Sequence, residues 1–177
     1  MVDFTALIRD VPDFPEPGIV FKDIMPLLAD AERLRAVVGA LADPWRDASL
    51  TAVVGIEARG FLLGTPVAMA LGVGFIAVRK AGKLPGPTVQ ETYGLEYGTD
   101  TIEIHADAVS AGDHVLVLDD VLATGGTAAA AAALLQRLGA SVAGFSFLLE
   151  LGFLDGRARL GDTRIERLML VDDEAGD

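Results

Sequence analysis

The stretch from Val115 to Ala133 constrains the fold more than any other part of the chain. It begins with four apolar residues, continues with Asp119 and Asp120, and passes through the turn Thr124–Thr127 into six consecutive alanines. Apolar β-favouring residues without alternation are typical of a buried parallel strand, and alanine is the strongest helix former. The stretch therefore predicts a strand, a loop and a helix in succession, as in an α/β fold.

The loop between this strand and helix has the chemistry of a phosphate site. Two consecutive glycines allow backbone N–H groups to converge on an anion, two threonine hydroxyls add donors, and the helix N-terminus adds a positive dipole end. Two carboxylates beside a phosphate would repel it, so Asp119 and Asp120 are expected to face ribose hydroxyls, a divalent cation, or both. A sugar phosphate with Mg²⁺ satisfies all these groups. The loop residues are Ala123, Thr124, Gly125, Gly126 and Thr127.

Other nucleotide-binding loops do not fit this chain. A P-loop NTPase requires a lysine after the last glycine of its loop, and none follows Gly126. A dinucleotide-binding fold requires a third glycine, which is missing after Gly72 and Gly74. A plain turn, with glycine and threonine as turn and cap residues, is the alternative for the loop taken alone. The apolar strand, the paired acids and the loop together argue against it.

The segment from Val115 to Thr127 resembles the phosphoribosyl diphosphate (PRPP) signature of the type I phosphoribosyltransferases. Further segments, in the order and at the spacing of that family, narrow the resemblance to the adenine phosphoribosyltransferases. These segments are Pro12–Pro15, Phe21–Ile24, Glu57–Phe61, Arg79–Pro87 and Glu91–Gly98.

The resemblance implies an α/β fold with a central, mostly parallel sheet flanked by helices, a long flexible catalytic loop and a small N-terminal base-binding region. It also implies a purine-salvage enzyme that transfers the 5-phosphoribosyl group of PRPP to adenine, giving AMP and diphosphate, with Mg²⁺ as cofactor. Two alternatives stay open: the same chemistry on hypoxanthine or xanthine, and a non-catalytic PRPP-sensing regulator on the same fold. Such a regulator would need a nucleic-acid-binding face, and none is visible in this acidic sequence.

The resemblance also assigns roles to individual residues. The phosphate loop is expected to hold the 5′-phosphate, and Asp119 and Asp120 the ribose, with Mg²⁺ bound through PRPP and these two acids. Glu96 matches the family's proposed general acid or base, which acts on the purine. The residues expected at the diphosphate are Glu57, Ala58, Arg59, Arg79, Lys80 and Lys83, with a cis peptide bond between the first two.

Adenine recognition is assigned, again by resemblance, to the segment that follows the N-terminal prolines. The base is expected to lie against Phe21, with main-chain groups near Val20 and Lys22 at the purine edge. A backbone carbonyl accepts a hydrogen bond from a 6-amino group but not from a 6-oxo group, so this arrangement favours adenine.

Apolar spacing along the rest of the chain predicts alternating helices and strands. Helical spacing near the N-terminus predicts a short helix that ends near Pro12, and Asp30 is the expected N-cap of a helix that ends by Pro44. The stretch from Ala81 to Gly98 is rich in glycine and proline and is expected to be a long mobile loop. Strands are expected at 51–56, 73–78, 101–105, 115–118, 142–149 and 165–171, and further helices at 61–71, 128–138 and 152–160.

Composition sets the remaining limits. At 177 residues the chain is expected to be a single domain, 1–177. Its formal charge of −12 would repel nucleic acids and anionic membranes, so the cations that bind a polyanionic substrate must be concentrated, at Arg59, Arg79, Lys80 and Lys83. No apolar stretch suggests a membrane span or signal peptide, and there is no cysteine, which together predict a cytoplasmic protein. A homodimer is implied by the resemblance alone.

Overall fold

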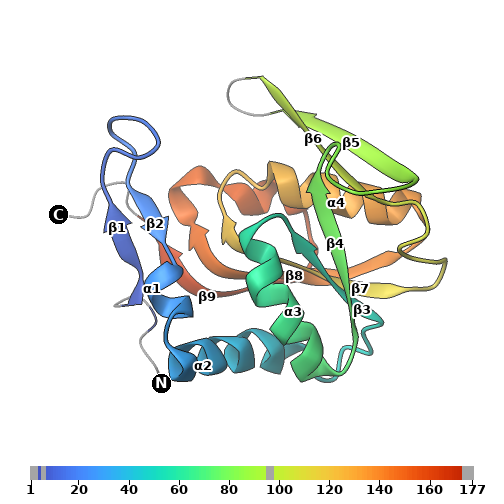
Figure 1. Ribbon diagram of the computed structural model, residues 1–177, viewed down its shortest axis with the longest axis horizontal. Coiled ribbons are helices and arrows are strands. Elements are labelled where there is room, and N and C mark those ends of the chain that lie inside the picture. Colours follow the sequence, from blue (N-terminus) through green and yellow to red (C-terminus); the bar gives the residue numbers. More distant parts are fainter. Residues whose placement is uncertain (1–3, 5–6, 95–97, 173–177) are drawn as a thin grey trace.

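The computed structural model describes residues 4, 7–94 and 98–172, and its centre is a seven-stranded sheet (Figure 1). The strand order is β5-β6-β4-β3-β7-β8-β9. The strands β4, β3, β7, β8 and β9 run parallel, while β6 pairs antiparallel with both β4 and β5 at one edge. The strands are β3 (Ala52–Ile56), β4 (Gly74–Lys80), β5 (Thr88–Gly94), β6 (Thr99–His105), β7 (His114–Leu122), β8 (Ser141–Leu151) and β9 (Ile165–Val171).

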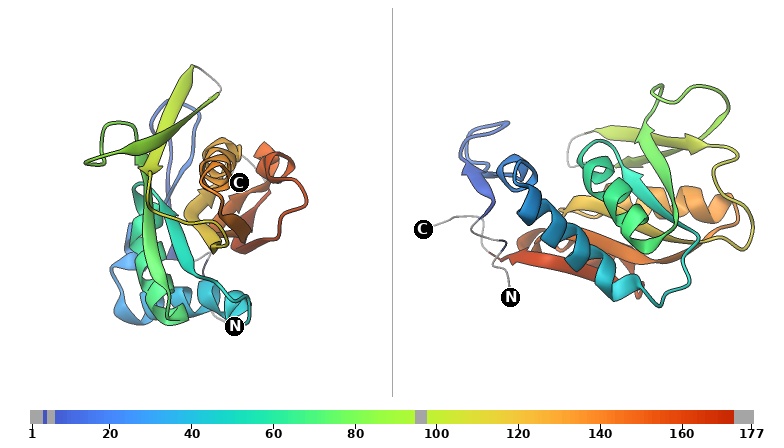
Figure 2. Two further views of the ribbon diagram at one scale, coloured as in Figure 1. Left: turned by 90° about the vertical axis from the view of Figure 1, so that its right-hand side faces the viewer. Right: turned by 60° about the horizontal axis from the view of Figure 1, so that its bottom comes forward.

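Helices cover both faces of the sheet (Figure 2). Val54 and Val117 face α4, whereas their neighbours Val53 and Leu116 point the other way and pack with α2 and α3. Both faces of the parallel strands are therefore buried, which explains why β3 and β7 are apolar almost throughout. The helices are α1 (Met25–Leu28), α2 (Ala31–Ala42), α3 (Arg59–Leu71) and α4 (Gly126–Arg137), with 3₁₀ segments η2 (Asp43–Trp45), η3 (Gly152–Leu154) and η4 (Gly156–Leu160).

The expected cap of α2 is confirmed. The side chain of Asp30 accepts hydrogen bonds from the backbone N–H groups of Glu32 (2.9 Å) and Arg33 (3.0 Å). These contacts satisfy two donors that the first turn of a helix cannot satisfy itself. They also lower the pKa of Asp30, chiefly through the Arg33 N–H.

The predicted N-terminal helix does not extend to Pro12, and its positions 1–3 and 5–6 lie outside the described residues. Instead, β1 (Arg9–Val11) pairs antiparallel with β2 (Phe21–Asp23) to form a separate two-stranded sheet. The cross-strand ion pair between Lys22 and Asp10, at 2.8 Å, supports this pairing. The spacing of apolar residues along a short segment does not report pairing with a distant segment. This is why the helical spacing did not predict the strand.

The expected long loop from Ala81 to Gly98 is also partly wrong. Residues Thr88–Gly94 form β5, which pairs along its whole length with β6, from Thr88 opposite His105 to Gly94 opposite Thr99. The glycines and prolines that suggested a loop are concentrated at 82–87, while the following residues include β-favouring valine, threonine and tyrosine.

The C-terminal part differs from expectation in one element. The helix expected at 152–160 is two 3₁₀ segments interrupted at Asp155, whose φ is 49°. The final strand, 165–171, is confirmed as β9. Among the helices of the described residues, none is long and apolar enough to cross a membrane.

Candidate functional site

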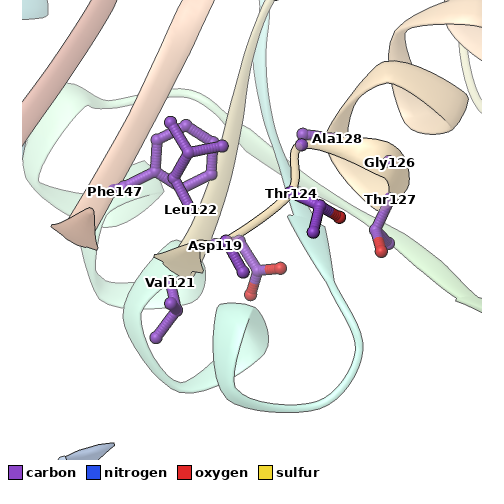
Figure 3. A pocket seen from close by; sticks show the side chains of 10 residues that line it. Asp119, Val121, Leu122, Thr124, Gly126, Thr127, Ala128 and Phe147 are labelled. Atoms are coloured by element: carbon purple, nitrogen blue, oxygen red, sulfur yellow. The ribbon is translucent and has the colours of Figure 1, made fainter. Parts of the chain in front are cut away.

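The ends of β4, β3 and β7 are neighbours in the sheet, and the phosphate loop follows β7. Gly125 has a φ of 77°, in the left-handed region that favours glycine, and α4 begins immediately after it. The loop surrounds a hollow of about 70 Å³, into which the first backbone N–H groups of α4 can point. In Figure 3 the side chains of Asp119, Thr124 and Thr127 lie around this hollow.

The paired acids at the end of β7 have different surroundings, because successive residues of a strand point to opposite faces. Asp119 lines the hollow. Asp120 is 3% exposed, and its Oδ2 lies 2.7 Å from Nε of Arg59. Burial raises the pKa of Asp119 well above its ordinary value, and the charge of Asp120 raises it further. Burial also raises the pKa of Asp120, although Arg59 opposes that shift.

Arg59, the first residue of α3, connects two parts of the site. Its contact with Asp120 is an ion pair rather than a directed hydrogen bond, since Asp120 Oδ2 receives no hydrogen bond from the described residues. Its guanidinium also lies over the ring of Phe21, 4.9 Å from the ring centroid. Phe21 makes an edge contact with Phe14, at 5.2 Å between centroids. The guanidinium therefore joins the end of β7 to the N-terminal sheet.

The other expected diphosphate residues gather at the ends of β3 and β4. The carboxylate of Glu57 accepts two hydrogen bonds from the Arg79 guanidinium, both of 3.0 Å, and one from the Lys80 N–H at 3.1 Å. Arg79 also donates through Nη1 to the carbonyl of Lys83. The hydrogen bonds from Arg79 are the main reason why the pKa of Glu57 is lowered. Lys80 Nζ lies 3.2 Å from Asp100.

These residues border a second hollow of about 210 Å³ between the phosphate loop and β4. The peptide bond between Glu57 and Ala58 beside it is cis, which confirms that expectation. The residues lining it are Ile56, Glu57, Val78, Arg79, Lys80, Tyr93, Asp100, Ile102, Asp119 and Thr127. The structure thus brings together the strand ends that carry the expected phosphate, ribose and diphosphate residues.

Tyr93 and Asp100, on the β5–β6 hairpin, are site residues that the sequence reasoning missed. Thr127 Oγ1 donates a hydrogen bond of 3.0 Å to the Tyr93 hydroxyl, so β5 touches the phosphate loop directly. Burial raises the pKa of Tyr93. The alternation of valine, threonine and tyrosine at 88–93 could have identified a strand here, but the glycines and prolines on either side concealed it.

The C-terminal segment around Gly156 also supports the phosphate loop, and no sequence motif predicted this contact. A Cβ atom on Gly156 would lie 2.1 Å from the Ala123 carbonyl oxygen, and one on Gly125 would lie 2.4 Å from the Gly156 carbonyl oxygen. The two backbones therefore pack against each other directly. Arg157 holds this segment to β8 through hydrogen bonds of 2.6 and 2.8 Å to Glu150.

The remaining predicted residues are less connected to these hollows. Lys22 is paired with Asp10, and Val20 is half-buried just before β2. Glu96 lies outside the described residues. Within 4, 7–94 and 98–172, no group of three or more histidine, cysteine, aspartate or glutamate side chains could hold a metal ion by itself.

Comparisons with known proteins agree with this geometry. Residues 27–173 match a family described as "Phosphoribosyl transferase domain". A protein of Desulfitobacterium hafniense (strain Y51) named adenine phosphoribosyltransferase is 59% identical over 159 residues, which are 90% of this chain and 92% of that protein. A similarly named protein of Streptomyces coelicolor is 62% identical over 153 residues, 86% of this chain and 84% of its own.

Solved structures are similar as well. The crystal structure of adenine phosphoribosyltransferase from Thermoanaerobacter pseudethanolicus superposes with a TM-score of 0.93 at 48% identity, covering 95% of this chain and 98% of that one. The enzyme from Trypanosoma brucei, solved with AMP, pyrophosphate and ribose-5-phosphate, has a TM-score of 0.86 at 27% identity, covering 98% and 82% of the two chains.

Proposed function

We propose roles for the residues of this site on the premise that the chain belongs to the adenine phosphoribosyltransferases of the phosphoribosyltransferase family. Its reaction is the transfer of the 5-phosphoribosyl group from PRPP to adenine, which gives AMP and releases diphosphate. One observation carries the assignment of roles. A phosphate loop, a carboxylate and a group of cations meet around two adjoining hollows at the ends of β3, β4 and β7.

The 5′-phosphate is assigned to the smaller hollow. The backbone N–H groups of 124–127 and the hydroxyls of Thr124 and Thr127 supply donors there, and the dipole of α4 favours the negative charge. Ala123 completes the loop. Its carbonyl packs against Gly156, so the backbone of another segment supports the loop. A preorganised site spends little binding energy on ordering itself.

The ribose is assigned to the end of β7. Asp119 can accept hydrogen bonds from ribose hydroxyls, and the neighbouring Asp120 is buried with Arg59 as its counter-ion. With the phosphate and the hydroxyls both held, C1 of the ribose is aimed at the base. As the bond from C1 to the diphosphate oxygen breaks, positive charge builds on the sugar, by analogy with glycoside cleavage, and the carboxylates stabilise it.

The diphosphate is assigned to the larger hollow. Arg79 and Lys80 border it, Lys83 is tied to Arg79 through its carbonyl, and Arg59 stands at the start of α3. Glu57 holds the Arg79 guanidinium in place, and Ala58 follows it in the turn. These cations stabilise the charge that accumulates on diphosphate as it departs.

Mg²⁺ fits this set of donors as a cofactor brought in with the substrate. Mg²⁺ in proteins is typically bound through one or two carboxylates together with substrate phosphates, and Asp119 lines the hollow while Asp120 is adjacent. The residues that would hold it are Asp119 and, in part, Asp120, with PRPP supplying the other oxygens. When bound there, the ion neutralises charge on the diphosphate.

Adenine is assigned to the face of Phe21, with main-chain groups of Val20 and Lys22 at its edge. The Phe21 ring sits between Phe14 and the Arg59 guanidinium, which places it near the end of β7. Glu96 is assigned as the general acid or base for the purine nitrogens, because it lies in the short segment between β5 and β6. Tyr93, three residues before it in the sequence, borders the larger hollow.

We further propose that residues 1–177 act as one domain, that the protein is cytoplasmic and that it is a homodimer. The two helix layers pack on opposite faces of the same sheet, each through its own apolar cluster, which supports a single unit. Exposed Leu62 and Met69 on α3 support a partner surface. The Arg79 guanidinium lies 5.9 Å from the ring centroid of Phe61, the residue before Leu62, so a partner on this part of α3 would come close to that arginine.

The function is tested by offering the protein PRPP and Mg²⁺ with adenine, hypoxanthine, guanine or xanthine, and measuring nucleotide formation by chromatography. Adenine should be preferred by a wide margin, because acceptors that read the 6-amino group lose their partner when a 6-oxo purine enters. Comparable rates with hypoxanthine would contradict the assignment to Val20 and Phe21. No product with any base would favour the PRPP-sensing alternative.

A further inference from the structure

Glu103, on β6, is a buried carboxylate outside the roles assigned above. The residue is 2% exposed. A buried carboxylate must be compensated by hydrogen bonds or by a cation, because leaving water costs it a large solvation energy. The hydrogen bonds that Glu103 makes are with neutral donors, all of them on the chain that leads from β4 into β5.

Each oxygen of Glu103 has two donors. Oε1 accepts from the backbone N–H groups of Lys83 and Leu84, both at 2.9 Å. Oε2 accepts from Oγ1 of Thr88 at 3.2 Å and from Nε2 of Gln90 at 3.0 Å. One side chain therefore fixes both ends of the 82–87 loop against β6.

These donors keep the carboxylate charged. They lower the pKa of Glu103 to about 2, with the Leu84 N–H as the largest contribution, and burial opposes the shift. A carboxyl with a lowered pKa stabilises the folded state at pH values above its ordinary pKa, and this stabilisation is lost only as the pH falls towards 2. Glu103 is therefore ionised at neutral pH, and its contacts do not depend on titration there.

The loop that Glu103 fixes is connected to the larger hollow. The carbonyl of Lys83, whose N–H binds Glu103, accepts a hydrogen bond of 3.1 Å from Nη1 of Arg79. The other side of the same guanidinium binds Glu57. Arg79 is also the direct partner of Glu103 in the register of β4 and β6. A continuous set of contacts thus runs from Glu103 through Lys83 and Arg79 to the turn after β3.

We propose that Glu103 is a positioning residue for the diphosphate: it anchors the 82–87 loop so that the Lys83 carbonyl holds Arg79 at the larger hollow. Glu103 touches no substrate atom itself. The proposal rests on the assignment of the diphosphate to this hollow. It predicts a selective effect, because the 5′-phosphate and adenine are bound by other elements.

The decisive variant is Glu103→Met, which keeps the length of the side chain but cannot accept four hydrogen bonds. Binding of diphosphate with Mg²⁺, of PRPP and of AMP is measured by calorimetry. Losing an anchoring contact of this kind should weaken diphosphate and PRPP binding about 10-fold or more. AMP, which has no diphosphate, should bind within about 2-fold of wild type. In kinetics, the KM for PRPP should rise far more than the KM for adenine.

Glu103→Gln is the matched control. Its oxygen can still accept from the Lys83 and Leu84 N–H groups, while Gln90 can turn its amide to face the new NH₂ group. Most of the diphosphate affinity should therefore return. Equal loss in the Gln and Met variants would mean that the charge, and not the anchoring, matters, and would overturn the proposal.

Other outcomes separate this inference from its premise. If Lys83→Ala weakens diphosphate binding but a folded Glu103→Met protein does not, the inference alone is wrong. If Lys83→Ala and Arg79→Ala both leave diphosphate binding unchanged, the diphosphate does not bind in the larger hollow. The role of Glu103 is then wrong as well. A general loss that includes AMP would show a merely structural role.

Wild-type protein provides a check should Glu103→Met not fold. Hydrogen exchange at the Lys83 and Leu84 amides should be strongly slowed even without ligand, because both are bound to a buried acceptor. Exchange at the rate of a free peptide would show that Glu103 does not anchor the loop.

Discussion

Three cations of the site, Arg59, Arg79 and Lys80, each have an acidic partner of their own. Such pairing restricts these long side chains in a chain whose net charge is −12. When a polyanion binds, its phosphate oxygens can replace the carboxylate oxygens that these cations already contact. These side chains therefore lose part of their conformational entropy during folding, and less is lost when the substrate binds.

Glu96 carries the sharpest prediction at the scale of the residue. A general acid or base typically contributes about 10²- to 10⁴-fold to turnover, so Glu96→Gln should lower kcat within that range while PRPP affinity changes little. The comparison needs saturating substrates, so that a defect in loop closure is not mistaken for lost chemistry. Wild-type turnover in the variant would leave positioning and charge as the main sources of catalysis.

Asp119 predicts a pH dependence of substrate binding. Its raised pKa favours the neutral form, so this group destabilises the folded state as the pH rises above the ordinary value of 3.8. Mg²⁺ and PRPP need the ionised form. Their binding should therefore release a proton and weaken as the pH falls through the raised pKa. Calorimetry in two buffers with different heats of ionisation measures this release, and Asp119→Asn should reduce it. A heat independent of buffer in the wild type would contradict the prediction.

At the scale of the element, local patterns predicted what local energies determine. The strand, loop and helix from Val115 onwards, the Asp30 cap and the final strand at 165–171 depend on propensity, capping and burial. Two of the differences from expectation, at β1 and β5, are strands whose partners lie elsewhere in the chain. Their stability comes from pairing, which periodicity does not report.

The candidate site was predictable to a similar extent. Residues with a recognisable motif, such as the phosphate loop and Arg79, lie around the hollows. Tyr93, Glu103 and Gly156 carried no motif. Their contacts arise from the crossing of distant segments, so they could be identified only in three dimensions.

Packing between the C-terminal segment and the phosphate loop gives the prediction at this scale. In Gly156→Ala the new methyl group would lie 2.1 Å from the Ala123 carbonyl, so the loop must move. Overpacking costs about 1–3 kcal/mol, and AMP and PRPP should bind about 10-fold more weakly. Diphosphate binding should stay close to wild type. Gly39→Ala, in an open position of α2, is the control: it should stabilise the helix slightly and leave AMP and PRPP binding unchanged.

At the scale of the molecule, the exposed face of α3 predicts assembly. Leu62 is 48% exposed and Met69 is 77% exposed, one above the other at a spacing of two helical turns. Met69→Lys should weaken a dimer about 10-fold or more without unfolding the monomer, because a cation suits the last turn of a helix. Light scattering across a dilution series measures this. Leu154→Lys is the control, because this exposed residue lies near the edge strand β9 and not on α3. It should leave the mass measured by light scattering unchanged.

The two roles of Arg59 exclude each other, and this implies an order in which the substrates bind. Its guanidinium covers the Phe21 ring on which adenine is proposed to stack, yet it is also assigned to the diphosphate. Adenine should therefore enter second, after PRPP has drawn Arg59 away. In an isotope-trapping experiment, labelled PRPP bound to the enzyme should be carried into AMP when excess unlabelled substrates are added, and labelled adenine should not. Equal trapping of both would mean that either substrate can enter first.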